Sequence, residues 1–176
     1  MPVLNNQTRK SKVPLTSATE KDIEAVSSQL GRPARDIAAV AARCVCGNPI
    51  VVQTKPRLED GTPFPTVYYL TLPAATAAVS TLEASGLMQQ LQDRLSEEPE
   101  LASKYQLAHE SYLADRKLLG EVEEIEGISA GGMPSRVKCL HSLVAHSLAK
   151  GPGVNPIGDA ALEICSWSPT RCVCAN

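Results

Sequence analysis

The sequence is poor in aromatic residues, with one Trp, one Phe and four Tyr among 176 residues. Proteins that bind single-stranded nucleic acid usually stack the bases on aromatic side chains, so this composition argues against that class. Positive charge is also scarce, because 17 Lys and Arg are outnumbered by 19 Asp and Glu, which gives a net charge of −2. Nucleic-acid-binding domains are usually basic, and we therefore expect no nucleic-acid partner.

Long hydrophobic segments are missing as well. No stretch approaches the roughly 18 apolar residues that span a bilayer, and residues 1–22 lack the apolar segment of a secretory signal. We therefore expect a cytoplasmic protein without a membrane span. Cytoplasmic thiols are normally kept reduced, so the six cysteines are expected to be free, metal-bound or reactive. Their even number leaves a disulfide-bonded alternative open.

The sequence predicts one domain that lies between an N-terminal arm and a short C-terminal tail. Residues 1–16 are polar, basic and contain proline, which is typical of a disordered arm. Residues 17–168 are long enough for a single domain with a hydrophobic core. Residues 169–176 form a tail that contains two cysteines.

Hydrophobic patterning within residues 17–168 predicts an α+β fold, in which a small three-stranded antiparallel sheet packs against several helices on one side. Ser17 and Glu20 have the spacing of a capping box, and Gly31 predicts the end of the helix that follows. The expected strands cover about 37–46, 50–57 and 66–71. Further helices are expected from Pro73 with a break near Gly86, from Pro99, over about 135–149 and over about 158–165, and Trp167 is expected to dock on the core.

Four of the six cysteines lie in two nearly identical phrases, RCVCGN at 43–48 and RCVCAN at 171–176. Zinc takes four Cys or His ligands in structural sites, and the C-x-C spacing is less specific than the usual C-x2-C. Zinc or another transition metal is therefore a candidate cofactor, while burial as small hydrophobic side chains is the alternative for free cysteines. Two ligand sets are open: Cys44 and Cys46 with Cys139 and His141, or Cys44 and Cys46 with Cys172 and Cys174. We favour the first, because the second phrase is a chain end that is expected to fray unless it folds back.

The segment SRVKCLHSLVAHSLAKG at 135–151 places Cys139, His141 and His146 on one expected helix. At 100° per residue, Cys139 and His146 share a face, whereas His141 lies across the helix at the edge of the apolar side. This geometry favours either a metal site that includes Cys139 and His146, or separate roles for the two histidines. Cys139 and His141 can therefore bind one metal only if the helix begins irregularly near Lys138. Cys139 is also a candidate nucleophile, but His146 is two turns away, about 10.5 Å along the axis, so His141 or another group would have to assist it.

A glycine-containing loop, Ser129 to Gly132, precedes this segment. Helix N-termini attract anions, and Arg136 and Lys138 are expected in the first turn. The two residues are therefore candidate ligands for an anion or a phosphate group, with a plain flexible loop as the alternative.

Five phrases stand out along the chain: RCVCGNP, DGTPFPTVYYLT, LEASGLM, AGGMPSRVKCLHSLVAH and GPGVNPIGD. Together they resemble the family called domain of unknown function 501, over about Val26 to Asp159. The resemblance implies an actinobacterial source and an unassigned biochemical activity. It also implies a link to cell division or phosphate metabolism, because family members are often encoded near a septum-formation initiator protein and an exopolyphosphatase. Four positions, Cys44, Cys139, His141 and His146, match Cys and His positions of the family, but Leu72 stands where the family has a cysteine.

Three classes of function follow as expectations. The first is a metal-stabilised module with a Cys/His site, the second a thiol- or phosphate-handling enzyme that uses Cys139, Lys138 and a histidine. The third is an interaction protein with a partner in cell division. The sequence leaves open whether the protein is an enzyme.

Overall fold

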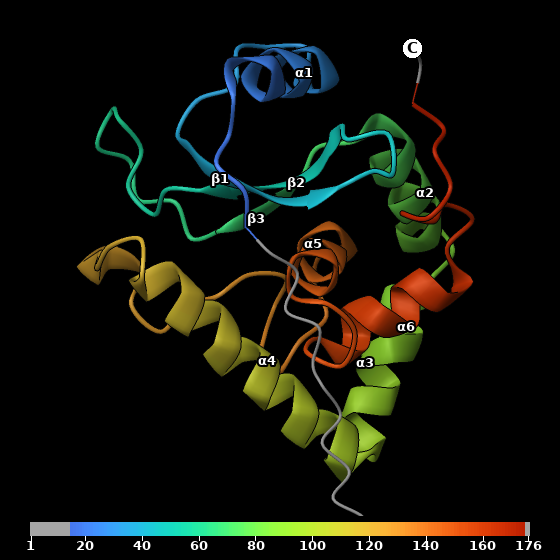
Figure 1. The fold of residues 1–176 in the computed structure, drawn as a ribbon. Helices are drawn as coiled ribbons and strands as arrows, with labels where there is room; N and C mark the ends of the chain where they lie inside the picture. The colour runs from blue at the N-terminus through green and yellow to red at the C-terminus, as the bar shows by residue number, and fades with distance from the viewer. Residues whose placement is uncertain (1–14, 175–176) are drawn as a thin grey trace, which may run out of the picture.

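A computed structural model of the chain describes residues 15–174, so most of the predicted N-terminal arm lies outside the described residues. Within this range, six α-helices and one 3-10 helix surround a three-stranded antiparallel sheet (Figure 1), and the predicted α+β class is confirmed. The elements in chain order are α1 (Glu20–Leu30), β1 (Ile37–Arg43), β2 (Pro49–Thr54), β3 (Tyr68–Leu70), α2 (Pro73–Ala84), α3 (Leu87–Glu97), α4 (Pro99–Lys117), η1 (Glu123–Ile125), α5 (Leu140–Lys150) and α6 (Pro156–Ile164).

The sheet has the strand order β1-β2-β3, so each strand pairs with its neighbour in the sequence. β-Branched residues dominate β2, and Val52 pairs with Val40 on one side and with Tyr69 on the other. The strands are shorter than predicted because β1 ends at Arg43, where a tight turn begins. The Gly47 N–H donates to the Cys44 carbonyl oxygen at 2.8 Å, and Gly47 has a φ of 94°, which glycine adopts without strain.

Helices cover both faces of the sheet, so the prediction of helices on one side was wrong. α5 contacts all three strands from one face, and α1 lies over the opposite face (Figure 1). Val26 of α1 is fully buried, and the Gln29 side-chain amide donates to the Pro49 carbonyl oxygen at 2.9 Å. The short amphipathic α1 thus closes the second face of the sheet.

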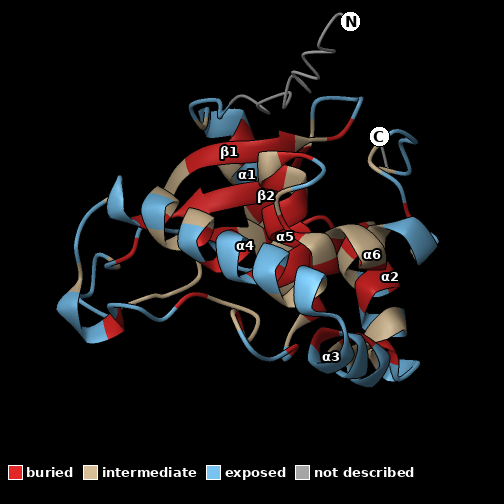
Figure 2. Cartoon of the chain, turned by 90° about the horizontal axis from the view of Figure 1, so that it is seen from below, coloured by how far each residue is buried: buried red, intermediate tan, exposed pale blue. Residues whose placement is uncertain are grey.

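The buried helix at the centre of the domain is α5, which is largely red in Figure 2. It is buried on most of its surface because the sheet, α2 and α6 all pack on it. The predicted start at Ser135 was wrong, since α5 begins at Leu140. The preceding residues form turns, in which the N–H groups of Arg136 and Lys138 donate to the carbonyl oxygens of Gly132 and Gly131.

Other sequence signals agree with the structure to different degrees. Gly86, with a φ of 82°, separates α2 from α3 as predicted, and Pro99 begins α4. The capping box is formed by Thr19 and Asp22 instead of Ser17 and Glu20. Trp167 is 6% exposed and belongs to the hydrophobic core, so its predicted docking is confirmed.

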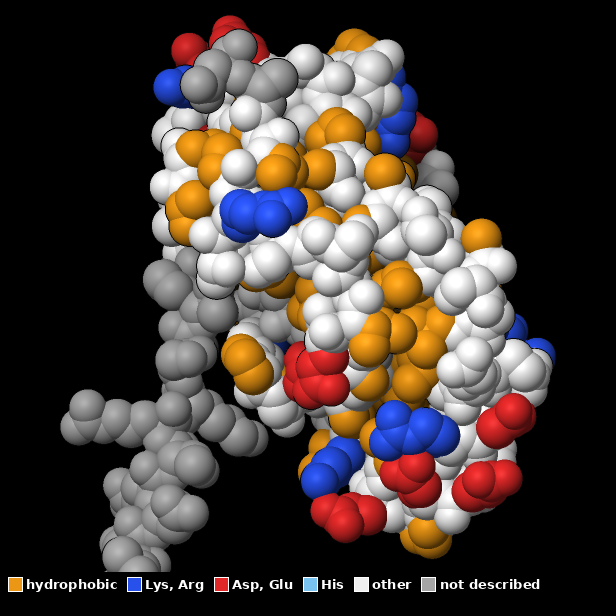
Figure 3. Space-filling view, turned by 90° about the vertical axis from the view of Figure 1, so that its right-hand side faces the viewer, with side chains coloured by type: hydrophobic (Ala, Val, Ile, Leu, Met, Phe, Trp, Pro, Cys, Tyr) orange, Lys and Arg blue, Asp and Glu red, His pale blue; other side chains and the backbone are white. Residues whose placement is uncertain are grey.

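The C-terminal tail returns to the sheet after α6. It runs past α2 toward the β1–β2 turn (Figure 1), and a cleft between α2 and the tail is lined by Ala74, Trp167 and Val173. Figure 3 shows a strip of hydrophobic side chains on this face of the molecule. The tail therefore packs on the domain, which places its cysteines next to residues from the beginning of the sheet.

Candidate metal-binding centres

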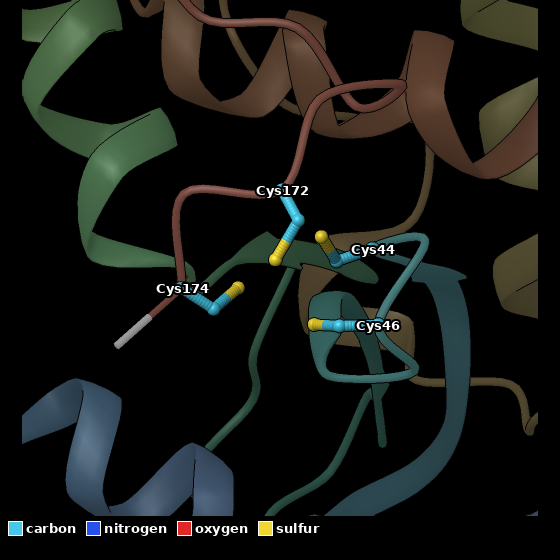
Figure 4. Close-up of side chains that lie close together, drawn as sticks. All are labelled: Cys44, Cys46, Cys172 and Cys174. Carbon is cyan, nitrogen blue, oxygen red and sulfur yellow. The ribbon is translucent and has the colours of Figure 1, made fainter. Parts of the chain in front are cut away.

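The first centre consists of Cys44, Cys46, Cys172 and Cys174. The four sulfur atoms lie within 4.8 Å of one another, and they turn toward a common point in Figure 4. This is the second of the two ligand sets that the sequence left open. The favoured pairing of Cys44 with Cys139 is not formed, because Cys139 belongs to a different group of side chains.

Local structure explains how each C-x-C phrase presents two sulfur atoms. The residues between the cysteines, Val45 and Val173, are 68% and 47% exposed. Cys44 directly follows β1, and Cys46 lies in the turn that the Gly47 N–H closes on the Cys44 carbonyl oxygen, so both sulfur atoms reach the tail phrase while the valines face solvent. The two nearly identical phrases thus lie next to each other in the structure.

The environments of these sulfur atoms are unequal. Cys44 is 5% exposed and part of the hydrophobic core, whereas Cys46 is exposed. The Asn48 backbone N–H, together with Cys172, lowers the pKa of Cys46 to about 7, and burial raises the pKa of Cys174 to about 12. The turn after Cys46 therefore supplies a hydrogen bond that favours a thiolate at this position.

The second centre consists of Glu83, Cys139 and His141. One donor atom from each side chain lies within 4.8 Å of the others. Glu83 comes from the last turn of α2, while Cys139 is the N-cap of α5 and His141 its second residue. Cys139 has extended backbone angles, with φ −151° and ψ 109°. This is the irregular helix start near Lys138 that the sequence required for Cys139 and His141 to face one site.

Hydrogen bonds fix the three side chains of the second centre. His141 Nδ1 lies 3.1 Å from Glu83 Oε1, and His141 Nε2 lies 3.1 Å from the Thr76 carbonyl oxygen. The same Glu83 oxygen accepts the Leu140 N–H at 2.8 Å, and the Ser142 hydroxyl donates to the Cys139 sulfur at 3.7 Å. Each of the three donor groups is therefore oriented by a neighbour from α2 or α5.

The charges of the second centre are coupled. Cys139, with help from Glu83, raises the pKa of His141 to about 9 against the effect of burial. Burial raises the pKa of the Cys139 thiol, but hydrogen bonds from His141 and Ser142 outweigh it, so the net pKa is lowered. Without a bound ion, this centre therefore favours a thiolate beside an imidazolium.

His146, the third predicted ligand on α5, belongs to the hydrophobic core. It is fully buried, stacks on Tyr68 with ring centroids 5.8 Å apart, and its Nδ1 lies 3.1 Å from the Asn155 side-chain nitrogen. Its surroundings include Tyr112 at a ring-centroid distance of 5.1 Å. His146 is thus separate from both groups of candidate ligands in the described chain.

The predicted anion ligands Arg136 and Lys138 are exposed and precede α5 instead of lying in its first turn. The Glu83 carboxylate already accepts the first N–H of that helix, from Leu140. A carboxylate of the protein thus occupies the position where an anion would bind a helix N-terminus.

Sequence reasoning missed Glu83 and ranked the tail cysteines second. The signal for Glu83 was the spacing of Thr76, Ser80 and Glu83, which puts three polar side chains on one face of an otherwise alanine-rich helix. Ser80 Oγ lies 3.2 Å from His141 Nε2, so this polar face of α2 is the one that meets α5.

Comparison with known proteins adds a family but no activity. A family model described as "Protein of unknown function (DUF501)" matches residues 40–163. That range includes Cys44, Cys46 and the whole second centre, and it ends before Cys172 and Cys174. No curated protein and no solved structure matches the chain. In residues 15–174, each helix is too short or too polar to cross a membrane.

Proposed function

Because the chain belongs to the DUF501 family, whose function is unknown, we propose a function from its own geometry: it is a metal-stabilised domain that binds one zinc ion through Cys44, Cys46, Cys172 and Cys174. The observation that carries the proposal is the convergence of four sulfur atoms within 4.8 Å of one another. They come from two segments at opposite ends of the domain, and nothing in the local sequence of either segment requires them to meet.

The donor chemistry supports zinc. Four cysteine thiolates are a common ligand set of structural zinc sites, which are tetrahedral and closed. Zinc–sulfur bonds of 2.3 Å place the sulfur atoms about 3.8 Å apart in a tetrahedron, which agrees with the 4.8 Å limit observed here. With four protein ligands the ion has no free position, so its role is structural.

Such an ion would fasten the tail to the β1–β2 turn. In the described part of the chain, the backbone hydrogen bond of the tail is local, from Arg171 to Ser168. Trp167 anchors the start of the tail in the core, and the sulfur atoms anchor its end. Metal binding therefore adds its free energy to folding, because the site exists only when both segments are in place.

Metal analysis tests the proposal. The purified full-length protein, kept reduced, is expected to lose one zinc ion per chain when Cys172 and Cys174 are both changed to Ser, as measured by elemental mass spectrometry. Cobalt substitution is expected to give the absorption of a tetrahedral tetrathiolate complex, which the double variant lacks.

Cys165→Ser is the matched control, because Cys165 is partly buried and belongs to neither centre. It is expected to retain all of the zinc. Equal metal content in the wild type and the double variant would refute the proposal, as would two disulfides among these four cysteines in protein prepared without oxidant. Iron in place of zinc would keep the site and change its metal.

The cytoplasmic location, the actinobacterial source and the partner in cell division stay predictions. Nothing in the geometry favours a phosphate substrate at Arg136 and Lys138.

A further inference from the structure

We propose that Glu83, Cys139 and His141 form a second zinc site, in which three protein ligands hold the ion and the fourth position is open to water. The proposal is independent of the four-cysteine site, since the two groups share no residue. It rests on the convergence of three different donor types, one carboxylate, one thiolate and one imidazole, at the contact between α2 and α5.

The histidine has the environment of a metal ligand. In zinc sites the ring nitrogen that does not bind the metal usually donates its hydrogen to a carboxylate or a backbone carbonyl. His141 Nε2 lies 3.1 Å from the Thr76 carbonyl oxygen, so the hydrogen is placed on Nε2. Nδ1 then faces Glu83 Oε1 at 3.1 Å, and it would bind an ion by giving up the proton that it shares with this carboxylate.

The other two ligands are held in the same way. Glu83 Oε1 accepts the Leu140 N–H at 2.8 Å, which fixes the carboxylate against the start of α5. The Cys139 sulfur accepts from the Ser142 hydroxyl at 3.7 Å. Outer partners of this kind orient metal ligands and account for a large part of the affinity of a site.

The number of protein ligands distinguishes this site from the four-cysteine centre, because three residues leave one coordination position unfilled. The side chains of Glu83 and His141 are 25% and 28% exposed, and Cys139 is also partly exposed. Three protein ligands plus a solvent-accessible position are typical of catalytic zinc sites, in which bound water is activated for hydrolysis. The class of chemistry that this site supports is therefore hydrolysis by a zinc-bound water, with Lys138 adjacent in sequence as an exposed positive charge.

Zinc stoichiometry of single-site variants tests this inference. We expect two zinc ions per chain in the wild type. Cys139→Ser and Glu83→Gln are each expected to remove one ion while Cys172→Ser/Cys174→Ser removes the other, and Cys165→Ser is expected to remove neither. Glu83→Gln keeps an oxygen that can accept the Leu140 N–H, so it separates ligation from a folding defect, which circular dichroism checks.

A second measurement probes the open position. In cobalt-substituted Cys172→Ser/Cys174→Ser protein, added azide is expected to change the visible spectrum, because it can occupy the fourth position. In Cys139→Ser protein, azide is expected to leave the tetrathiolate spectrum unchanged. If the double variant folds, holds no metal, and Cys139 reacts with iodoacetamide equally fast with and without added zinc, the inference fails.

The outcomes of the two proposals are distinguishable. A single zinc ion that is lost only in Cys172→Ser/Cys174→Ser would leave the proposed function standing and overturn the second site. A single ion that is lost only in Cys139→Ser and Glu83→Gln would do the reverse.

Discussion

The two groups of cysteine-containing side chains differ in how the chain assembles them. The four-cysteine centre joins a hairpin turn near the start of the domain to the tail at its end. The Glu83, Cys139 and His141 centre lies where two packed helices meet, and its residues are held by hydrogen bonds from those helices. Under the proposed function, a metal in the first centre would fasten the end of the tail, whereas the second centre is already held in place by the packed helices.

The two centres also differ in their position relative to the residues that the family model matches. The second centre lies wholly within the matched residues 40–163, while the first straddles the end of the match. We therefore regard the helix-based centre as part of the domain itself and the tail contact as an addition to it.

The largest expected effect comes from removing the proposed metal of the first centre. A cross-link that closes a loop of 100 residues or more contributes about 5 kcal/mol in the chain-entropy model. Urea unfolding of Cys172→Ser/Cys174→Ser is expected to show a loss approaching that value, and a chelator is expected to reproduce it in the wild type. Cys139→Ser is expected to cost less, because α2 and α5 stay packed without an ion. A larger loss in Cys139→Ser would reverse the comparison.

His146 belongs to neither centre, and its burial predicts that the stability of the protein depends on pH. Burial lowers the pKa of His146 to about 4, against a raising effect of Asp115 and with a lowering effect of Lys150. Tyr68 and Tyr112 are the other titratable groups that face it. The folded pKa lies below the unfolded value of about 6.5, so the unfolded chain takes up the proton first as the pH falls.

The contribution of His146 to the free energy of unfolding is therefore fully present above about pH 6.5. It is lost as the pH falls toward 4, by on the order of 3 kcal/mol. His146→Gln is expected to flatten the stability profile between these pH values, as measured by urea unfolding of metal-free protein. An unchanged slope in the variant would show that His146 is not the group that titrates.

The smallest expected effect is a difference in unfolding free energy between substitutions of Cys44 and Cys46, which belong to the same phrase. In metal-free protein, Cys44→Ser is expected to cost about 1–3 kcal/mol, because it places a hydroxyl in the core where Cys44 is 5% exposed. Cys46→Ser is expected to change the unfolding free energy by less than about 0.5 kcal/mol, since Cys46 is exposed. With zinc bound, both variants lose one ligand and are expected to converge. Equal costs in the metal-free state would contradict the difference in burial.

The elements of the fold were largely readable from local patterns. β-Branched residues marked β2, and the prolines at 73 and 99 and the glycine at 86 marked the limits of α2, α3 and α4. The start of α5 was misjudged, because Ser135 has the chemistry of a cap but the segment from Gly131 to Cys139 makes its own turns. The helical wheel of α5 grouped His146 with Cys139, but Cys139 is the extended N-cap and His146 lies in the core, because this helix is buried on most of its surface.

The sequence by itself determined that each C-x-C phrase carries two sulfur donors close together, because the spacing within a phrase is a property of the covalent chain. It also determined that Cys139 and His141 share a site only if the helix starts late. Tertiary structure alone decided which cysteines meet and that Glu83 joins the second centre. Those contacts depend on how the tail returns to the hairpin and how α2 packs on α5, and no local pattern encodes the distance between segments that are remote in the chain.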